Sequence, residues 1–194
     1  MPEMAKTETA AYALTVADLL RKQAGTRAHA VALQDARGVL SYVELDRAAS
    51  RLAQALLVRG LRAGDRVAVL SENCREYLQL QLAAAKIGVI VACLNWRLAD
   101  AELTHCLRLV SPRMVFVSAR YAPTLARIEH VVAQVILIET QFDAFLAGVL
   151  EDDPRFDVDP EQGLVILYTS GTTGLPKGAV ISQRAMVARA MCFA

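Results

Sequence analysis

The chain has 194 residues, which fits one domain of ordinary size or a fragment of a larger protein. Hydrophobic residues make up 55% of it, above the roughly 45–50% of typical soluble domains, so a disordered or fibrous protein is excluded. Twenty-one basic and 20 acidic residues are interspersed and leave a net charge of +1, which excludes a charged block for nucleic acid or anionic membranes and favours small-molecule partners.

The first predicted elements are a helix, a hairpin and a second helix. The first helix spans 15–24 and ends at Gly25, and the hairpin joins 30–34 to a short strand that starts at Gly38. Ser41 and Glu44 form a capping box, in which each side chain accepts a hydrogen bond from the other residue's backbone amide. Apolar residues at helical spacing between 45 and 56 predict the second helix, which ends at Gly60 and packs one face on a sheet.

From residue 66 onward, predicted strands and helices alternate. Strands are expected over 66–70, 89–94 and 114–118, with helices over 75–87 and 100–110 between them. A weaker unit follows, with a helix over 124–130, a strand over 135–139 and a helix over 142–150. The strands are short, rich in Val and Ile, and lack polar alternation, as in parallel sheets buried on both faces. The sequence therefore predicts an open α/β fold, with a mostly parallel sheet and helices on both faces.

The acidic segment 151–162, which holds two prolines and has no apolar periodicity, is predicted to be a solvated connector. It divides the chain into three parts. Residues 1–150 form an α/β subdomain, and 151–163 form the connector. Residues 164–194 form a strand, a loop and the start of a helix that leads into a further subdomain.

Membrane insertion, secretion and a metal centre are not indicated. The longest apolar run, 87–94, falls short of the ~18 residues of a membrane span, and the first ten residues lack the apolar core of a secretory signal, so we expect a cytoplasmic protein. No C-x-x-C pair occurs, and small core positions are expected for all four cysteines, Cys74, Cys93, Cys106 and Cys192. No catalytic role is expected for the three histidines, His29, His105 and His130.

The segment 164–194 carries the chemistry. A buried-type strand over 164–168 runs into a glycine-rich loop over 169–178, and a helix is expected from about residue 182, an order that predicts a phosphate-binding site. Glycines let backbone amides approach an anion and permit positive φ, hydroxyl groups add donors, and a lysine can follow a polyphosphate. The residues expected to bind the phosphates of ATP are Thr169, Ser170, Gly171, Thr172, Thr173, Gly174, Lys177 and Gly178.

The loop differs from a Walker A loop. Pro176 precedes the lysine where a Walker loop has glycine, and Gly178 stands where a serine or threonine would hold magnesium. A nucleotide-binding module of the Walker type is therefore disfavoured.

The stretch 168–178, YTSGTTGLPKG, resembles the signature of the adenylate-forming, AMP-binding superfamily of acyl-CoA synthetases, peptide-synthetase adenylation domains and luciferases. Weaker matches lie upstream in the family's order, at 40–45, 64–67, 73, 86–88 and 94–98. The resemblance covers the chain from about residue 15 onward and is closest to the acyl-CoA synthetases. It implies the amino-terminal subdomain of an acetyl-CoA synthetase-like fold.

The resemblance also implies an activity. Such ligases join a carboxylic acid, here a fatty or aromatic acid, to ATP to form an acyl-adenylate and pyrophosphate, and then transfer the acyl group to coenzyme A. The loop would hold the β- and γ-phosphates, with Lys177 adding positive charge as pyrophosphate leaves, and Mg²⁺ would bridge the phosphates without a ligand from this chain. The family's later motifs would lie beyond residue 194, so a truncated fragment that does not turn over alone is expected.

Two other readings remain open. An amino-acid-activating adenylation domain is the nearest rival, although that class tends to carry Ser at the position of Thr172. A non-catalytic assembly module, self-associating through apolar surface exposed by truncation, is the other. The family often has His at the position of Gln183, which leaves the local packing near the last helix, and the acyl pocket beside it, in question.

Overall fold

The computed structural model describes residues 14–130, 132–169 and 174–192. The first described helix, α2 (Val16–Thr26), is followed by an antiparallel hairpin of β1 (Val31–Asp35) and β2 (Gly38–Ser41), as predicted. Ser41 then caps the next helix, α3 (Tyr42–Val58), through a reciprocal pair of hydrogen bonds with Glu44. The capping box is therefore confirmed.

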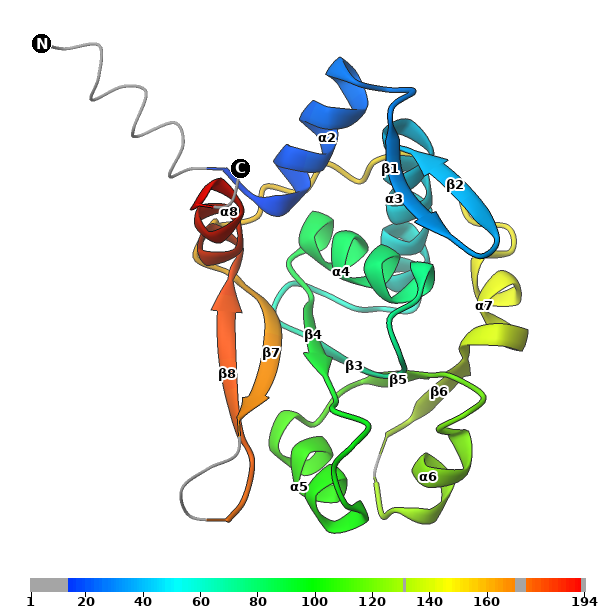
Figure 1. Ribbon diagram of the computed structural model, residues 1–194, viewed down its shortest axis with the longest axis vertical. Helices are drawn as coiled ribbons and strands as arrows, with labels where there is room; N and C mark the ends of the chain where they lie inside the picture. Colours follow the sequence, from blue (N-terminus) through cyan, green and yellow to red (C-terminus); the bar gives the residue numbers. More distant parts are fainter. Residues whose placement is uncertain (1–13, 131, 170–173, 193–194) are drawn as a thin grey trace, which may run out of the picture.

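A six-stranded sheet forms the centre of the molecule (Figure 1). Its strands are β3 (Arg66–Leu70), β4 (Ile90–Cys93), β5 (Met114–Val117), β6 (Gln134–Leu137), β7 (Gly163–Thr169) and β8 (Lys177–Ser182). The spatial order is β6-β5-β3-β4-β7-β8, and every pairing is parallel except that of β7 with β8. The carboxyl ends of the neighbouring parallel strands β4 and β7 therefore lie at the same edge of the sheet. Open α/β sheets bind their ligands at this edge.

Helices cover both faces of the sheet, as Figure 1 shows. The remaining ones are α4 (Arg75–Ile87), α5 (Asp100–Val110), α6 (Ala122–Arg127), α7 (Ile138–Leu146) and α8 (Gln183–Cys192). Residues of α3, α4 and α7 share one apolar core with Val67 and Val69 of β3, whereas α5 and α6 share a second core with Ala68 and Leu70. Successive residues of β3 thus point into opposite cores, one on each face of the sheet, which confirms the predicted open α/β fold. Within the described ranges, no helix is both long and apolar enough to cross a bilayer.

Two helices begin earlier than predicted. Helix α6 starts at Ala122 because Pro123 sits in its first turn, where the missing amide hydrogen costs nothing. Helix α7 starts at Ile138, inside the predicted strand, because the backbone amide of Leu137 donates to the side chain of Gln141 and so caps the helix there. Both departures come from local helix-start signals that apolar periodicity does not register.

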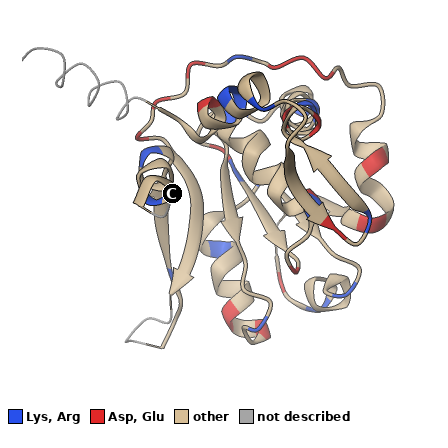
Figure 2. Cartoon of the chain, turned by 45° about the horizontal axis from the view of Figure 1, so that its top comes forward, with Lys and Arg blue, Asp and Glu red and all other residues tan. Residues whose placement is uncertain are grey.

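The connector between α7 and β7 has no buried residue, in keeping with a solvated segment, but it is also anchored to the domain. The Asp153 carboxylate accepts hydrogen bonds from Arg21 Nε at 2.6 Å and from Lys86 Nζ at 2.9 Å. Lys86 also donates to Asp46 at 2.7 Å, and its side chain is 0% exposed. Figure 2 shows the acidic connector passing beside the basic residues of α2. The prediction missed this because the basic partners lie far away in the sequence.

The cysteines do not all lie in the core. Cys106 is buried, Cys74 and Cys93 are partly buried, and Cys192 is exposed at the end of α8. The prediction of a core position is therefore wrong for Cys192, because the buried residues of α8 are Gln183 and Val187 and the end of the helix faces away from them.

Candidate functional site

The glycine-rich loop is the tip of a β-hairpin. Strands β7 and β8 pair antiparallel, with Tyr168 opposite Gly178 and Thr169 opposite Lys177. The predicted order of strand, loop and helix is wrong, because β8 lies between the loop and α8. The β-branched pair Val180 and Ile181 favours this extra strand, and its pairing with β7 supplies the hydrogen bonds that a direct entry into a helix would lack.

Four of the eight predicted phosphate-binding residues lie within the described part of the chain. These are Thr169, Gly174, Lys177 and Gly178, whereas Ser170, Gly171, Thr172 and Thr173 lie outside the described residues. The hairpin brings Thr169 and Lys177 together as direct cross-strand partners, whose side chains project from the same face. Lys177 is exposed, so its ammonium group is free to meet a ligand at the hairpin tip.

The two described glycines of the loop serve different purposes. Gly174 has a φ of +93°, a left-handed conformation that side chains rarely adopt, so the predicted positive φ is confirmed there. At Gly178 the prediction is wrong, since φ is not positive. A Cβ atom at Gly178 would lie 2.9 Å from Cγ2 of Ile166, so glycine is needed there for close packing across the hairpin.

A cavity of about 470 Å³ opens beside the hairpin tip, between the ends of β4 and β7 and the start of α5. Its volume is within the range of small-molecule sites. It is lined by Asn95, Leu98, Glu102, Tyr168, Thr169, Gly174 and Pro176. The Glu102 carboxylate accepts a hydrogen bond from the Ala99 amide at 2.8 Å, which places part of its charge against the start of α5 and reduces its repulsion of an anion.

Helix α5 contacts the hairpin on both sides of the loop. His105 Nε2 lies 3.1 Å from the carbonyl oxygen of Pro176, a buried residue, on the β8 side. On the β7 side, the Tyr168 hydroxyl donates to the carbonyl of Cys106 at 3.3 Å, and burial raises the pKa of Tyr168, which keeps this donor protonated. No catalytic role was expected for His105, and its contact with Pro176, 71 positions away, left no signal in the local sequence.

Gln183 does not face the cavity. Its side chain is fully buried, accepts a hydrogen bond from the Val16 amide at 3.0 Å and donates to the Ala85 carbonyl at 2.8 Å. Where the family often has His, this chain therefore has a residue that joins α8 to α2 and α4.

The described residues contain no group of three or more His, Cys, Asp or Glu side chains arranged to hold a metal ion. The described part of the hairpin tip offers the Thr169 hydroxyl, backbone amides and the exposed ammonium group of Lys177, which suit an anion.

Comparison with known proteins gives a consistent result. The sequence profile described as AMP-binding enzyme matches residues 20–193. A fatty acid–[acyl-carrier-protein] ligase, ScoC of Streptomyces coeruleorubidus, is 36% identical over 77% of this chain and 29% of its own length. The indoleacetate–CoA ligase of Aromatoleum aromaticum is 32% identical over 89% of this chain and 36% of its own. The chain thus spans about a third of the length of these curated relatives.

Solved structures agree. The N-terminal domain of FACL13 from Mycobacterium tuberculosis matches with a TM-score of 0.80 and 29% identity, over 87% of this chain and 44% of that one. VinN in complex with 3-methylaspartate matches with a TM-score of 0.83 over 94% of this chain and 51% of that one. Its identity of 24% shows a shared fold alone.

Proposed function

Because the chain belongs to the AMP-binding enzyme family, we propose that it is the amino-terminal portion of a cytoplasmic, ATP-dependent acyl-CoA synthetase. The observation that carries the proposal is the pairing of Thr169 with Lys177 at the base of a glycine-rich loop, beside a cavity at the carboxyl edge of the sheet. The names of the relatives, a fatty-acid ligase and an indoleacetate ligase, support a fatty or aromatic acid as substrate.

The reaction that fits these residues begins with attack of a carboxylate oxygen on the α-phosphorus of ATP. A bond forms between carboxylate and phosphorus, the bond to the β-phosphate oxygen breaks, and pyrophosphate leaves from an acyl-adenylate. A thiol, that of coenzyme A, then displaces AMP from the acyl group. The chain's contribution is to hold the leaving pyrophosphate, because donors fixed around developing charge lower the barrier most.

Each part of the loop has a role in this step. Residues 169–174 offer hydroxyl and amide donors to the β- and γ-phosphates, and Gly178 keeps the two strands close. Lys177 supplies an ammonium charge that follows pyrophosphate as it departs. Mg²⁺ supplies further positive charge when it accompanies the nucleotide, and we assign it no ligand among these residues.

The decisive experiment is binding of inorganic pyrophosphate to the chain, measured by isothermal titration calorimetry. Replacing Lys177 by Ala should weaken binding about tenfold or more, because a charge-assisted hydrogen bond contributes about 1.5–3 kcal/mol. The matched control is Lys22→Ala, which removes the same charge from an exposed position on α2. Equal affinities for wild type and Lys177→Ala would remove the basis of the proposal. We also expect no pyrophosphate release from ATP and acid by this chain above the level of Lys177→Ala.

One observation favours a second candidate, a self-associating assembly module. Several large apolar side chains on the hairpin and α8 are exposed, namely Leu167, Leu175, Val180 and Met191. Exposed apolar side chains promote association when a partner covers them. Light scattering over a concentration series separates the two candidates: mass that grows with concentration and falls back in a Val180→Lys variant supports the module, whereas a constant monomer mass contradicts it. The exposed residue Val58, on α3, provides the matched control Val58→Lys.

A further inference from the structure

We propose that His105 is a positioning residue for the phosphate loop, and that it fixes the backbone from which Lys177 reaches the pyrophosphate. The inference rests on the proposed function and concerns a residue that does not itself contact phosphate. It starts from the 3.1 Å contact between His105 Nε2 on α5 and the carbonyl oxygen of Pro176, the residue before β8.

The direction of this hydrogen bond follows from its acceptor. A carbonyl oxygen can only accept, so the Nε2 atom of His105 must carry the proton and donate. Proline contributes a fixed φ and no amide hydrogen of its own, so the carbonyl is the polar backbone group through which Pro176 can be held. Pro176 is a buried residue, which reduces the access of water to that carbonyl even though the residue lies at the edge of the cavity.

The consequence for Lys177 comes from the geometry of the peptide bond. The Pro176 carbonyl and the Lys177 nitrogen belong to one planar unit, so orienting the carbonyl also orients the backbone that carries the lysine side chain. On its other side, Lys177 is held by pairing with Thr169. His105 therefore limits the directions from which the ammonium group can approach a ligand at the hairpin tip.

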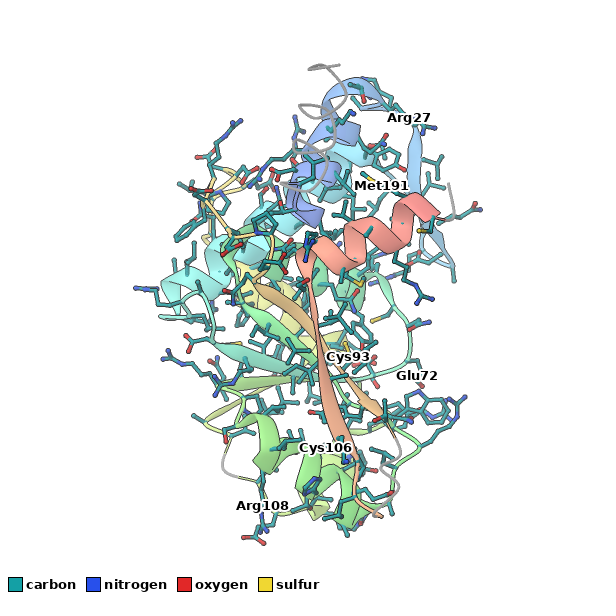
Figure 3. All side chains as sticks on the ribbon, turned by 90° about the vertical axis from the view of Figure 1, so that its left-hand side faces the viewer. Arg27, Glu72, Cys93, Cys106, Arg108 and Met191 are labelled. Carbon is teal, nitrogen blue, oxygen red and sulfur yellow. The ribbon has the colours of Figure 1, made fainter. Side chains whose placement is uncertain are left out.

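Helix α5 also contacts the β7 side of the hairpin, through Cys106, the residue that follows His105. The Tyr168 hydroxyl donates to the carbonyl of Cys106, so adjacent positions on one helix contact β7 and the residue that precedes β8. Figure 3 shows Cys106 on α5 close to the loop end of the hairpin. Cys106 and Leu107 are buried in an apolar core that α5 shares with the sheet, so packing anchors α5.

The test is pyrophosphate binding by calorimetry in variants of the same chain. His105→Phe keeps the bulk of the ring but removes the donor, and it should weaken binding about two- to tenfold, the equivalent of one hydrogen bond. His105→Gln, whose amide nitrogen can take the place of Nε2, should bind within about twofold of wild type, whereas the shorter His105→Asn should resemble His105→Phe. The matched control is His29→Phe at an exposed position. Without ligand, His105→Phe should remain folded and lower the unfolding midpoint by a few degrees, about 2–4 °C for each kcal/mol lost with the hydrogen bond.

The outcomes separate this inference from the proposed function. If Lys177→Ala weakens binding but His105→Phe does not, the inference fails and the proposed function stands. If Lys177→Ala has no effect, the proposed function fails and the inference falls with it. Equal weakening by His105→Phe and His105→Gln would mean that packing rather than the hydrogen bond matters, which also overturns the inference.

Discussion

We expect Asp153→Ala to lower the free energy of unfolding by about 3 kcal/mol, because it removes one of two carboxylates from a lysine that is fully buried. Breaking a buried ion pair is costly since the remaining charge is left without compensation. Lys86 keeps its contact with Asp46, so the loss should lie at the lower end of the usual range of about 3–5 kcal/mol. The change also releases Arg21, which donates to both oxygens of Asp153.

The effect of Asp153 should depend on pH. Burial opposes ionisation of this carboxyl, but hydrogen bonds from Arg21, from the Arg155 amide and from Lys86 outweigh it and hold the pKa of Asp153 well below the ordinary value for aspartate. A depressed pKa in the folded state means that the stabilisation is fully present above the unfolded pKa of about 4 and is lost as pH falls toward the folded pKa. The stability difference between wild type and Asp153→Ala should therefore be constant above about pH 5 and shrink below about pH 4.

Urea unfolding followed by circular dichroism at several pH values measures both effects. Asp152→Ala is the matched control, because Asp152 is an exposed neighbour that contributes its backbone carbonyl to Gln54. It should change the free energy of unfolding by less than about 0.5 kcal/mol. A loss for Asp153→Ala no greater than that of the control would show that the connector is not anchored through this residue.

The parts of the fold that follow from short-range patterns could be predicted. The capping box at Ser41, helix α4 with its end at Gly88, and strand β3 all lie where the sequence placed them, because each depends on neighbours within a few residues. Buried parallel strands also reveal themselves by unbroken apolar runs. The open α/β fold followed from their alternation with helices.

The parts that depend on distant partners could not be predicted. Asp153 looks like a residue of a solvated acidic segment until the fold brings Lys86 and Arg21 to it. His105 looks like an ordinary helical histidine until the fold brings Pro176, the residue before β8, next to α5. Strand β8 itself was missed because a short strand next to a glycine-rich loop lacks the length for a clear pattern. At the candidate site, the glycine-rich loop could therefore be predicted from the sequence, whereas its contacts with α5 were revealed only by the structure.

Gln183 provides the second large effect, and its change to Ala should lower the free energy of unfolding by about 2–4 kcal/mol. Its side chain satisfies two backbone groups that helix ends leave unpaired, the Val16 amide in the first turn of α2 and the Ala85 carbonyl in the last turn of α4. Each buried group left without a partner costs about 1–3 kcal/mol. The three helices that meet there are adjacent in Figure 1, so one side chain joins three elements.

A second variant at this position separates the hydrogen bonds from simple packing. Gln183→Glu has the same shape and still accepts from Val16, but its ionised carboxylate cannot donate to the Ala85 carbonyl and is repelled by it. It should therefore be less stable than wild type at neutral pH and recover as pH falls toward the ordinary glutamate pKa of about 4.3, where the acid regains a donor. The exposed glutamine of β1 supplies the control Gln34→Ala. If Gln183→Glu were as stable as wild type at pH 7, the donation to Ala85 would contribute nothing, and the packing of α8 on α4 would have to rest on Val187 and its apolar neighbours alone.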